Sequence, residues 1–317
     1  MAFHGWIILD KPVGLGSTQA VGAVKRLVRE AGEPKTKVGH GGTLDPLASG
    51  VLPIALGEAT KLAGRMLDAT KSYDFTIRFG EETDSLDLEG QIVATSDVRP
   101  AIGDIEAVLA RFTGEIEQVP PAFSALKVEG ERAYNLARAG KAVELNARRV
   151  TIHALAIRHP RESGDPANQK ENPGSRFRGN DDVADEITLS ATVSKGTYVR
   201  SLARDIAHAL GTVGHVTMLR RTKAGPFTLK QAISLDFLQD AAKARQLTRT
   251  VLPLEAGLDD IPALPVTPEQ AKLLRHGQPL FGIPAVPGLH LATSGQTPVA
   301  LVEVSDDGLR VVRGFNL

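Results

Sequence analysis

The order of strand-like and helical segments constrains the fold of this chain more than any other feature of its sequence. Four short apolar or alternating runs are typical of strands: WIILD (6–10), YDFTIRF (73–79), VTIHALAI (150–157) and ITLSATV (187–193). One apolar stripe runs through TYVRSLARDIAHAL (197–210) and predicts a helix. Because strands and helices do not alternate regularly, the pattern predicts an α+β fold on a mixed, mostly antiparallel sheet flanked by helices.

Two further segments carry local predictions. Ser17 is expected to cap a helix that ends near Gly32. The segment GVLPIALGEATKLAGRML (50–67) consists mostly of small residues and is expected to form helix or loop.

The chain is expected to form two domains. A proline-rich stretch at 252–268 indicates a boundary between a domain of residues 1–255 and a small β-rich domain of residues 262–317. In the second, two strand-like runs flank a turn-prone Asp-Asp-Gly at 306–308.

One segment, RHPRESGDPANQKENPGSRFRGNDD (158–182), differs in composition from its surroundings and is expected to be a polar loop insert. With suitable synonymous codons, the DNA for residues 158–166 becomes nearly the reverse complement of the DNA for residues 174–181. We infer either an inserted palindromic DNA element that is translated in frame or ordinary drift of a loop sequence. The coding sequence distinguishes the two origins.

The amino-acid composition limits the kinds of site and partner that this chain is expected to have. The chain of 317 residues has no cysteine, which excludes thiol chemistry and suits the reducing cytoplasm, where we expect the protein to lie. Its eight histidines are scattered, and neither a metal site nor a cofactor is expected. No apolar run reaches the length of a membrane span, and no signal peptide is expected. Lysine plus arginine equals aspartate plus glutamate at 37 each, so nucleic-acid binding requires local basic clusters.

The segment GHGGTLDPLASG (39–50) contains a single acidic residue, Asp45, between glycines and a proline. Glycines allow the backbone to approach another molecule closely. On local grounds, Asp45 could cap a helix that begins at Pro46, or it could be a reactive carboxylate.

Three other clusters accompany this loop: KSYDFTIRFG (71–80), SKGTYVRSLARDIAHALG (194–211) and MLRRTKAGPF (218–227). Their tyrosines could be packing residues, their arginines surface ion pairs, and LRRTK a solvated basic turn. Two basic sets could instead hold phosphates: the first is Lys195, Arg200, Arg204, Arg220, Arg221 and Lys223, and the second is Lys127, Arg132, Arg138, Lys141, Arg148 and Arg149.

These motifs, together with LDKPVGLGST and PPAFSALKVEGERAYNLARAG, resemble in the same order the conserved blocks of the TruB family of tRNA pseudouridine-55 synthases. The resemblance covers residues 5 to 235 and implies a pseudouridine-synthase domain followed by a PUA-like RNA-binding domain at 262–317. It implies isomerisation of a uridine in the T loop of tRNA by base flipping and covalent catalysis, without a cofactor, a membrane or an obligate protein partner. It also makes 120–145 an insertion that grips the RNA, whereas the 158–182 insert has no counterpart in the family.

The resemblance also implies roles for six residues. Asp45 would be the nucleophile, Arg200 would keep it ionised, and Tyr73 would stack on the uracil and serve in proton transfer. Tyr198 and Leu219 would complete the pocket. His40 would enter the RNA and take the place of the flipped base; alternatively, it is a turn residue bonded to its own loop.

Two other classes of protein share part of this pattern with the isomerase. A protein that binds tRNA without catalysis would share the basic and aromatic features but would not need Asp45. A hydrolase is suggested by His40-Gly41-Gly42, but it requires a GxSxG motif, and no serine of the chain has glycine at both positions −2 and +2.

Overall fold

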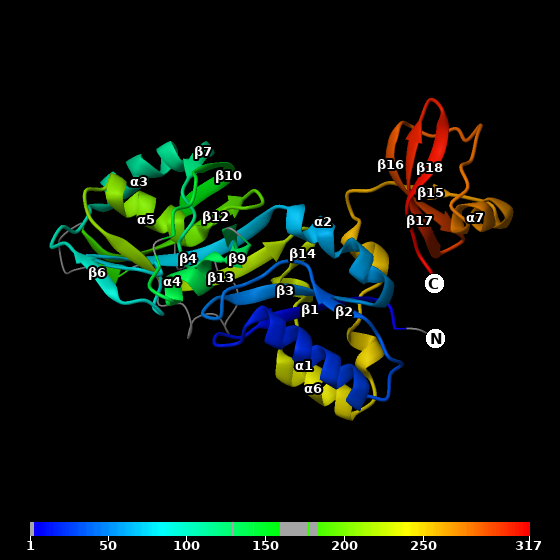
Figure 1. Ribbon diagram of the computed structural model, residues 1–317, viewed down its shortest axis with the longest axis horizontal. Coiled ribbons are helices and arrows are strands. Elements are labelled where there is room, and N and C mark those ends of the chain that lie inside the picture. The colour runs from blue at the N-terminus through cyan, green and yellow to red at the C-terminus, as the bar shows by residue number, and fades with distance from the viewer. Residues whose placement is uncertain (1–2, 129, 142, 159–175, 178–182) are drawn as a thin grey trace. The chain divides into compact units, whose positions relative to one another are not determined.

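The computed structural model describes residues 3–128, 130–141, 143–158, 176–177 and 183–317. The chain forms two compact units. Figure 1 colours the chain by residue number. The first unit comprises residues 1–45, 50–67 and 224–317, and the second comprises residues 46–49 and 68–223. The chain therefore leaves the first unit directly after Asp45. Most of the predicted 158–182 insert lies outside the described residues.

The second unit is built on an antiparallel array of strands. Its strand order is β13 (Gly214–Ala224), β4 (Lys71–Phe79), β12 (Ala184–Val193), β10 (Arg148–Ile157) and β7 (Gly114–Gln118), and the short β11 (Arg176–Phe177) also pairs with β12. The pairs β4–β12, β12–β10 and β10–β7 are antiparallel. Three of these strands are the ones that the alternating runs predicted, so the expected sheet is confirmed.

Two helices, α3 (Ile102–Leu109) and α5 (Val199–Ala209), pack on one face of this sheet (Figure 1). Phe75 and Leu189 of the strands share a buried core with Ile105 of α3 and Leu202 of α5. The helix predicted at 197–210 is thus confirmed as α5, whose apolar stripe lies on the sheet.

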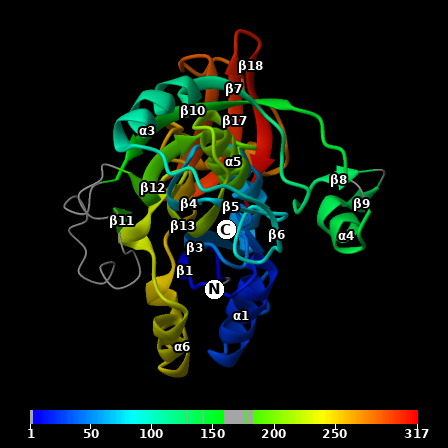
Figure 2. The same cartoon turned by 90° about the vertical axis from the view of Figure 1, so that its left-hand side faces the viewer.

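The remaining elements of the second unit are short. They are the hairpin of β5 (Glu81–Thr83) and β6 (Ile92–Thr95), the 3-10 helix η2 (Ala110–Phe112), the hairpin of β8 (Lys127–Val128) and β9 (Glu131–Arg132), and α4 (Ala133–Arg138). The segment from β8 to α4 lies within the predicted RNA-gripping insertion, 120–145. In Figure 2 it lies to one side of strands β4 and β12.

In the first unit, β3 (Ser49–Leu56) pairs antiparallel with β1 (Gly5–Lys11) and with β2 (Val38–His40). The expectation of helix or loop across residues 50–67 is therefore wrong for its first half. Gly50, Pro53 and Ala55 favour strands weakly, but every residue of β3 is buried, and burial outweighs their intrinsic preference. The second half is helical, with η1 (Gly57–Leu62) and α2 (Ala63–Asp68).

The predicted first helix is α1 (Ser17–Glu30), and it packs against α6 (Leu235–Lys243) (Figure 1). Its capping residue is Gly16, one position before the expected Ser17, because the Ser17 hydroxyl bonds to the backbone of Leu44 instead. Beyond the cap Ala31, Gly32 has a φ of +79°, as expected at a helix end. The short β14 (Phe227–Thr228), η5 (Leu229–Gln231), η6 (Leu247–Thr250) and η7 (Leu254–Gly257) complete this part of the unit.

The C-terminal region contains a small sheet in the order β15 (Ala263–Pro265), β16 (Gly288–Ser294), β17 (Thr297–Ser305) and β18 (Gly308–Gly314), with α7 (Pro268–Arg275) beside it. The predicted turn joins β17 to β18, with Ser305 opposite Gly308. Phe315 and Leu301 share a buried core with Trp6 and Phe227. The β-rich C-terminal region is confirmed, whereas the boundaries 1–255 and 262–317 stay predictions. None of the described helices combines the length and apolar character of a membrane span.

Candidate active site

The loop that carries Asp45 is anchored to helix α1 by one hydroxyl. Ser17 Oγ donates a hydrogen bond to the carbonyl oxygen of Leu44 (2.9 Å) and accepts one from the Leu44 amide (2.8 Å). Both residues are buried, and Asp45, which follows Leu44, is half-buried. The backbone directly before Asp45 is therefore held by two hydrogen bonds that water does not compete for.

Two glycines of this loop occupy positions that a larger residue would not fit, Gly41 because of close packing and Gly42 because of its backbone conformation. The Gly41 amide donates to the Pro53 carbonyl (2.8 Å). A Cβ atom at Gly41 would lie 2.6 Å from Met66 Cβ, so no larger residue fits without movement of that side chain. Gly42 has a φ of +130°, which residues with side chains rarely adopt.

Asp45 does not cap a helix. Pro46 and Leu47 form a turn, and the chain enters β3 at Ser49. The capping alternative is therefore wrong, because no helical N–H groups follow Asp45. The segment 46–49 belongs to the second unit, where Arg220 Nη1 donates to Ser49 Oγ (3.3 Å). The loop is thus anchored both one residue before and four residues after Asp45.

His40 ends β2 and is half-buried. Its Nδ1 accepts a hydrogen bond from the Gly42 amide (3.3 Å). This contact is the one that the alternative interpretation of His40, as a turn residue bonded to its own loop, requires. Insertion into RNA stays a prediction.

The structure places Asp45 and His40 in the first unit and the other four predicted site residues in the second. Tyr73 lies on β4 opposite Ala191 of β12, and Leu219 lies on β13. Both side chains are half-buried and pack against the core under α3 and α5. Tyr198 is the N-cap residue of α5, and its backbone amide and carbonyl both bond to the side chain of Gln118.

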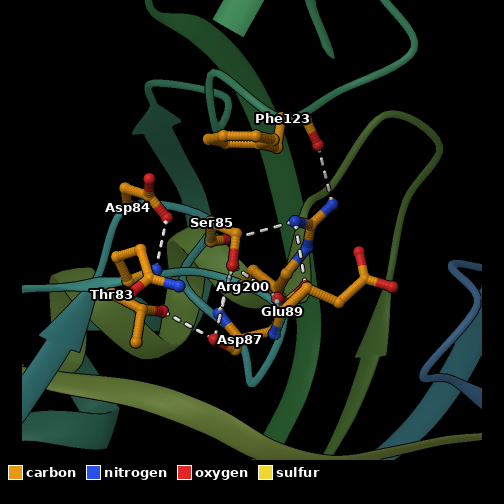
Figure 3. A network of polar contacts seen from close by, with 8 residues as sticks. Thr83, Asp84, Ser85, Asp87, Glu89, Phe123 and Arg200 are labelled. Carbon is orange, nitrogen blue, oxygen red and sulfur yellow. Dashed lines mark hydrogen bonds and ion pairs between the residues drawn. The ribbon is translucent and has the colours of Figure 1, made fainter. Parts of the chain in front are cut away.

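Arg200 is held in place by buried polar contacts (Figure 3). Its side chain is 6 % exposed, and Nη1 lies 3.1 Å from Oδ2 of Asp87. Nη1 also donates to the Ser85 carbonyl (2.8 Å), and Nη2 donates to the Phe123 carbonyl (3.0 Å). A buried guanidinium with these acceptors has its orientation fixed.

The carboxylate beside Arg200 belongs to Asp87, which is not among the site residues predicted from the sequence. Its Oδ1 accepts hydrogen bonds from Ser85 Oγ (2.5 Å) and from the Glu89 amide (3.0 Å), as Figure 3 shows. Thr83 Oγ1 holds the Asp87 carbonyl at 2.6 Å. The polar composition of TDSLDLEG is typical of a surface loop, so no local signal marked Asp87, although its side chain is only 9 % exposed.

A second buried cation, Lys71, lies two residues before Tyr73 on β4. Burial, together with the neighbouring Arg221 guanidinium, lowers the pKa of Lys71 from 10.5 to about 8. Arg221 is itself 1 % exposed within β13. The alternative that LRRTK forms a solvated turn is therefore wrong.

The two basic sets differ in exposure. In the first set, Arg200 and Arg221 are buried, and Lys195 pairs with Asp68 (2.9 Å). In the second set, every cation except Arg148 is exposed: Lys127, Arg132, Arg138, Lys141 and Arg149. The second set is therefore better suited to meet phosphates.

Chemically, these features provide an anchored carboxylate, aromatic rings beside an apolar core, and cations held in fixed orientation. Within the described residues, no three histidine or acidic side chains gather in a way that could bind a metal ion. Reactions in which a carboxylate acts as nucleophile or base suit this set of groups.

Comparison with known proteins identifies the family. The model of the TruB family pseudouridylate synthase (N terminal domain) matches residues 26–199, and that of the tRNA pseudouridylate synthase B C-terminal domain matches residues 200–259. The chain is 62 % identical over 313 residues to tRNA pseudouridine synthase B of Novosphingobium aromaticivorans, with 99 % of this chain and 97 % of the relative covered. It is 58 % identical over 315 residues to the protein of the same name from Zymomonas mobilis, with the same shares covered.

Solved structures show the same fold. The chain is similar to a protein in "Structure of H/ACA RNP bound to a substrate RNA containing 2'-deoxyuridine", with a TM-score of 0.70, 23 % identity, and 99 % of this chain and 85 % of that chain covered. A protein in "Crystal structure of the archaeal box H/ACA sRNP Nop10-Cbf5 complex" gives a TM-score of 0.68 at 23 % identity, with 99 % and 87 % covered. With the sequence matches, this likeness confirms the predicted fold class. The chain therefore belongs to the TruB family of pseudouridylate synthases and is an isomerase.

Proposed function

We propose that this chain converts one uridine of tRNA, at position 55 in the T loop, into pseudouridine. The observation that carries the proposal is its identity of 62 % and 58 %, over 99 % of its length, to relatives named tRNA pseudouridine synthase B. As part of this proposal, the reaction takes place in the cytoplasm, where tRNA is available as a substrate.

The reaction conserves atoms. The bond between ribose C1′ and uracil N1 breaks, the base turns, and C1′ bonds to C5; the proton lost from C5 is balanced by one gained at N1. Because nothing is oxidised, reduced or transferred away, the chemistry needs no redox or group-transfer cofactor. It does need a nucleophile to hold the substrate covalently while the base turns.

Asp45 is that nucleophile in our proposal. Its anchoring through Leu44 and Ser17 supports the role, because covalent attack requires a fixed approach of the reacting oxygen. In the same proposal, Arg200 supplies the positive charge that balances the negative charge of the Asp45 carboxylate. The bonds from Arg200 to Asp87, Ser85 and Phe123 would hold its charge in place through the reaction.

The substrate uridine must leave the stacked T loop, at a cost of a few kcal/mol. In our proposal Tyr73 stacks on the flipped uracil and takes part in proton transfer, Tyr198 and Leu219 complete the pocket, and His40 fills the position the base has left. The exposed cations of residues 127–149 grip the T stem-loop through its phosphates.

The experiment uses the purified protein and an unmodified tRNA transcript. Pseudouridine is labelled with a carbodiimide and mapped by primer extension, and a transcript with cytidine at position 55 is the control. We expect one new stop, at position 55, which the control lacks. Tight binding without any pseudouridine would instead support a protein that binds tRNA without catalysis, and modification at another position would refute the T-loop assignment.

A further inference from the structure

Arg148, the first residue of β10, lies against the ring of Tyr198. Its guanidinium carbon is 4.9 Å from the centre of that ring. A guanidinium at this distance is attracted by the negative face of the phenol ring. One face of Tyr198 is therefore covered by a cation from a neighbouring strand.

Gln118 holds the backbone of the same tyrosine. It ends β7, pairs with Arg148 across the β7–β10 ladder, and is 1 % exposed. Its Oε1 accepts a hydrogen bond from the Tyr198 amide (2.8 Å), and its Nε2 donates to the Tyr198 carbonyl (3.1 Å). Two neighbouring residues of one strand pair thus fix the ring and the backbone of Tyr198.

The guanidinium of Arg148 is poorly suited to bind RNA phosphate. Its Nε and Nη2 are buried, and the described part of the chain offers neither atom a hydrogen-bond acceptor. The next residue, Arg149, is exposed, because successive strand residues point to opposite faces. The two adjacent arginines of the second basic set therefore have different surroundings.

We propose that Arg148 is a positioning residue that acts through Tyr198. With Gln118, it fixes the ring so that only the uncovered face can meet the flipped uridine, and it does not contact phosphate. This inference rests on the proposed function. Because α5 begins directly after Tyr198 and Arg200 is its second residue, a displaced Tyr198 would also disturb the start of the helix that carries Arg200.

The test compares Arg148→Met with Arg149→Met in the full-length protein. The rate of pseudouridine formation is measured in single turnover at saturating tRNA, and the dissociation constant for tRNA is measured from 50 to 300 mM salt. For Arg148→Met we expect a rate about tenfold lower, a dissociation constant within about twofold of the wild type, and an unchanged salt dependence. For Arg149→Met we expect weaker binding and a log–log salt slope smaller by about one.

Two further variants separate positioning from a general loss of structure. Arg148→Lys keeps a cation near the ring and should recover part of the rate. In a Tyr198→Leu background there is no ring for Arg148 to hold, so Arg148→Met should lower the rate of pseudouridine formation only slightly further. The inference would be overturned in favour of a phosphate contact by either of two results. One is that Arg148→Met lowers the rate by the same factor with and without the Tyr198 ring, and the other is a reduced salt slope for Arg148→Met. Failure of the proposed function is distinct, since the wild-type protein itself would then form no pseudouridine.

Discussion

At the scale of single residues, the buried pair of Arg200 and Asp87 shows what the sequence could and could not reveal. Arg200 can be predicted as a site residue because it lies in a long recognisable motif next to Tyr198. Asp87 lies 113 positions earlier, in a polar loop, and becomes significant only when folding brings the loop to the start of α5. A contact between distant segments leaves no local pattern, so sequence reasoning could not have found this carboxylate.

The pair makes a prediction about stability. Arg200→Met leaves the buried Asp87 carboxylate without its guanidinium, and we expect the free energy of unfolding to fall by about 3 kcal/mol. Adding Asp87→Asn removes the uncompensated charge, so the double variant should lose less than the sum of the single variants. Urea unfolding measures all three. The exposed neighbour Asp84 is the control, since Asp84→Asn should change stability by less than about 0.5 kcal/mol; additive single losses would show that the pair does not act as a unit.

At the scale of elements, the strands and the helix that the sequence predicts are those in which the spacing of hydrophobic residues matches the pattern of buried residues in the structure. β4, β10, β12 and α5 have one apolar and one more polar face, and their hydrophobic patterns reveal this. β3 has no alternating pattern because it is buried along its whole length, and its glycine, proline and alanine are not typical of a strand. β13 was not predicted as a strand because its buried Arg221 stands in a basic run that is typical of a turn.

The contact between α1 and the Asp45 loop makes a prediction at this scale. Ser17→Ala removes both hydrogen bonds to Leu44 and leaves a buried amide and carbonyl unsatisfied, so we expect a loss of about 1 to 3 kcal/mol of stability. The rate at saturating tRNA should fall as well, because the backbone before Asp45 loses its anchor. Thermal melts and single-turnover rates measure both. Thr18→Ala, at the exposed next position, is the matched control; equal behaviour of the two variants would exclude anchoring by Ser17.

At the scale of the whole molecule, Lys71 predicts how stability depends on pH. Its pKa is about 8 in the folded protein, against an ordinary value of 10.5 that the unfolded chain should approach. Between these values the unfolded state binds more protons, so this site contributes stability that increases as pH rises. Below pH 8 Lys71 is charged in the folded protein, and the burial of this charge lowers the free energy of unfolding by its full amount.

Lys71→Met removes this titration. Relative to the wild type, the variant should therefore be most favoured below pH 8, and its advantage should shrink as pH rises towards 10. Urea unfolding of both proteins at pH 7 and at pH 9.5 gives the comparison, in which the other titrating groups cancel. A difference that stays constant or grows with pH would contradict a lowered pKa at Lys71.

The proposed reaction depends on Asp45 as the nucleophile, and Asp45→Asn tests this role most directly. The substitution keeps the size of the side chain and removes its nucleophilic oxygen. We predict that the variant forms no detectable pseudouridine in tRNA and binds the same tRNA with a dissociation constant within about threefold of the wild type, because phosphate contacts dominate affinity. Pseudouridine formed at the wild-type rate by Asp45→Asn would show that Asp45 is not the nucleophile.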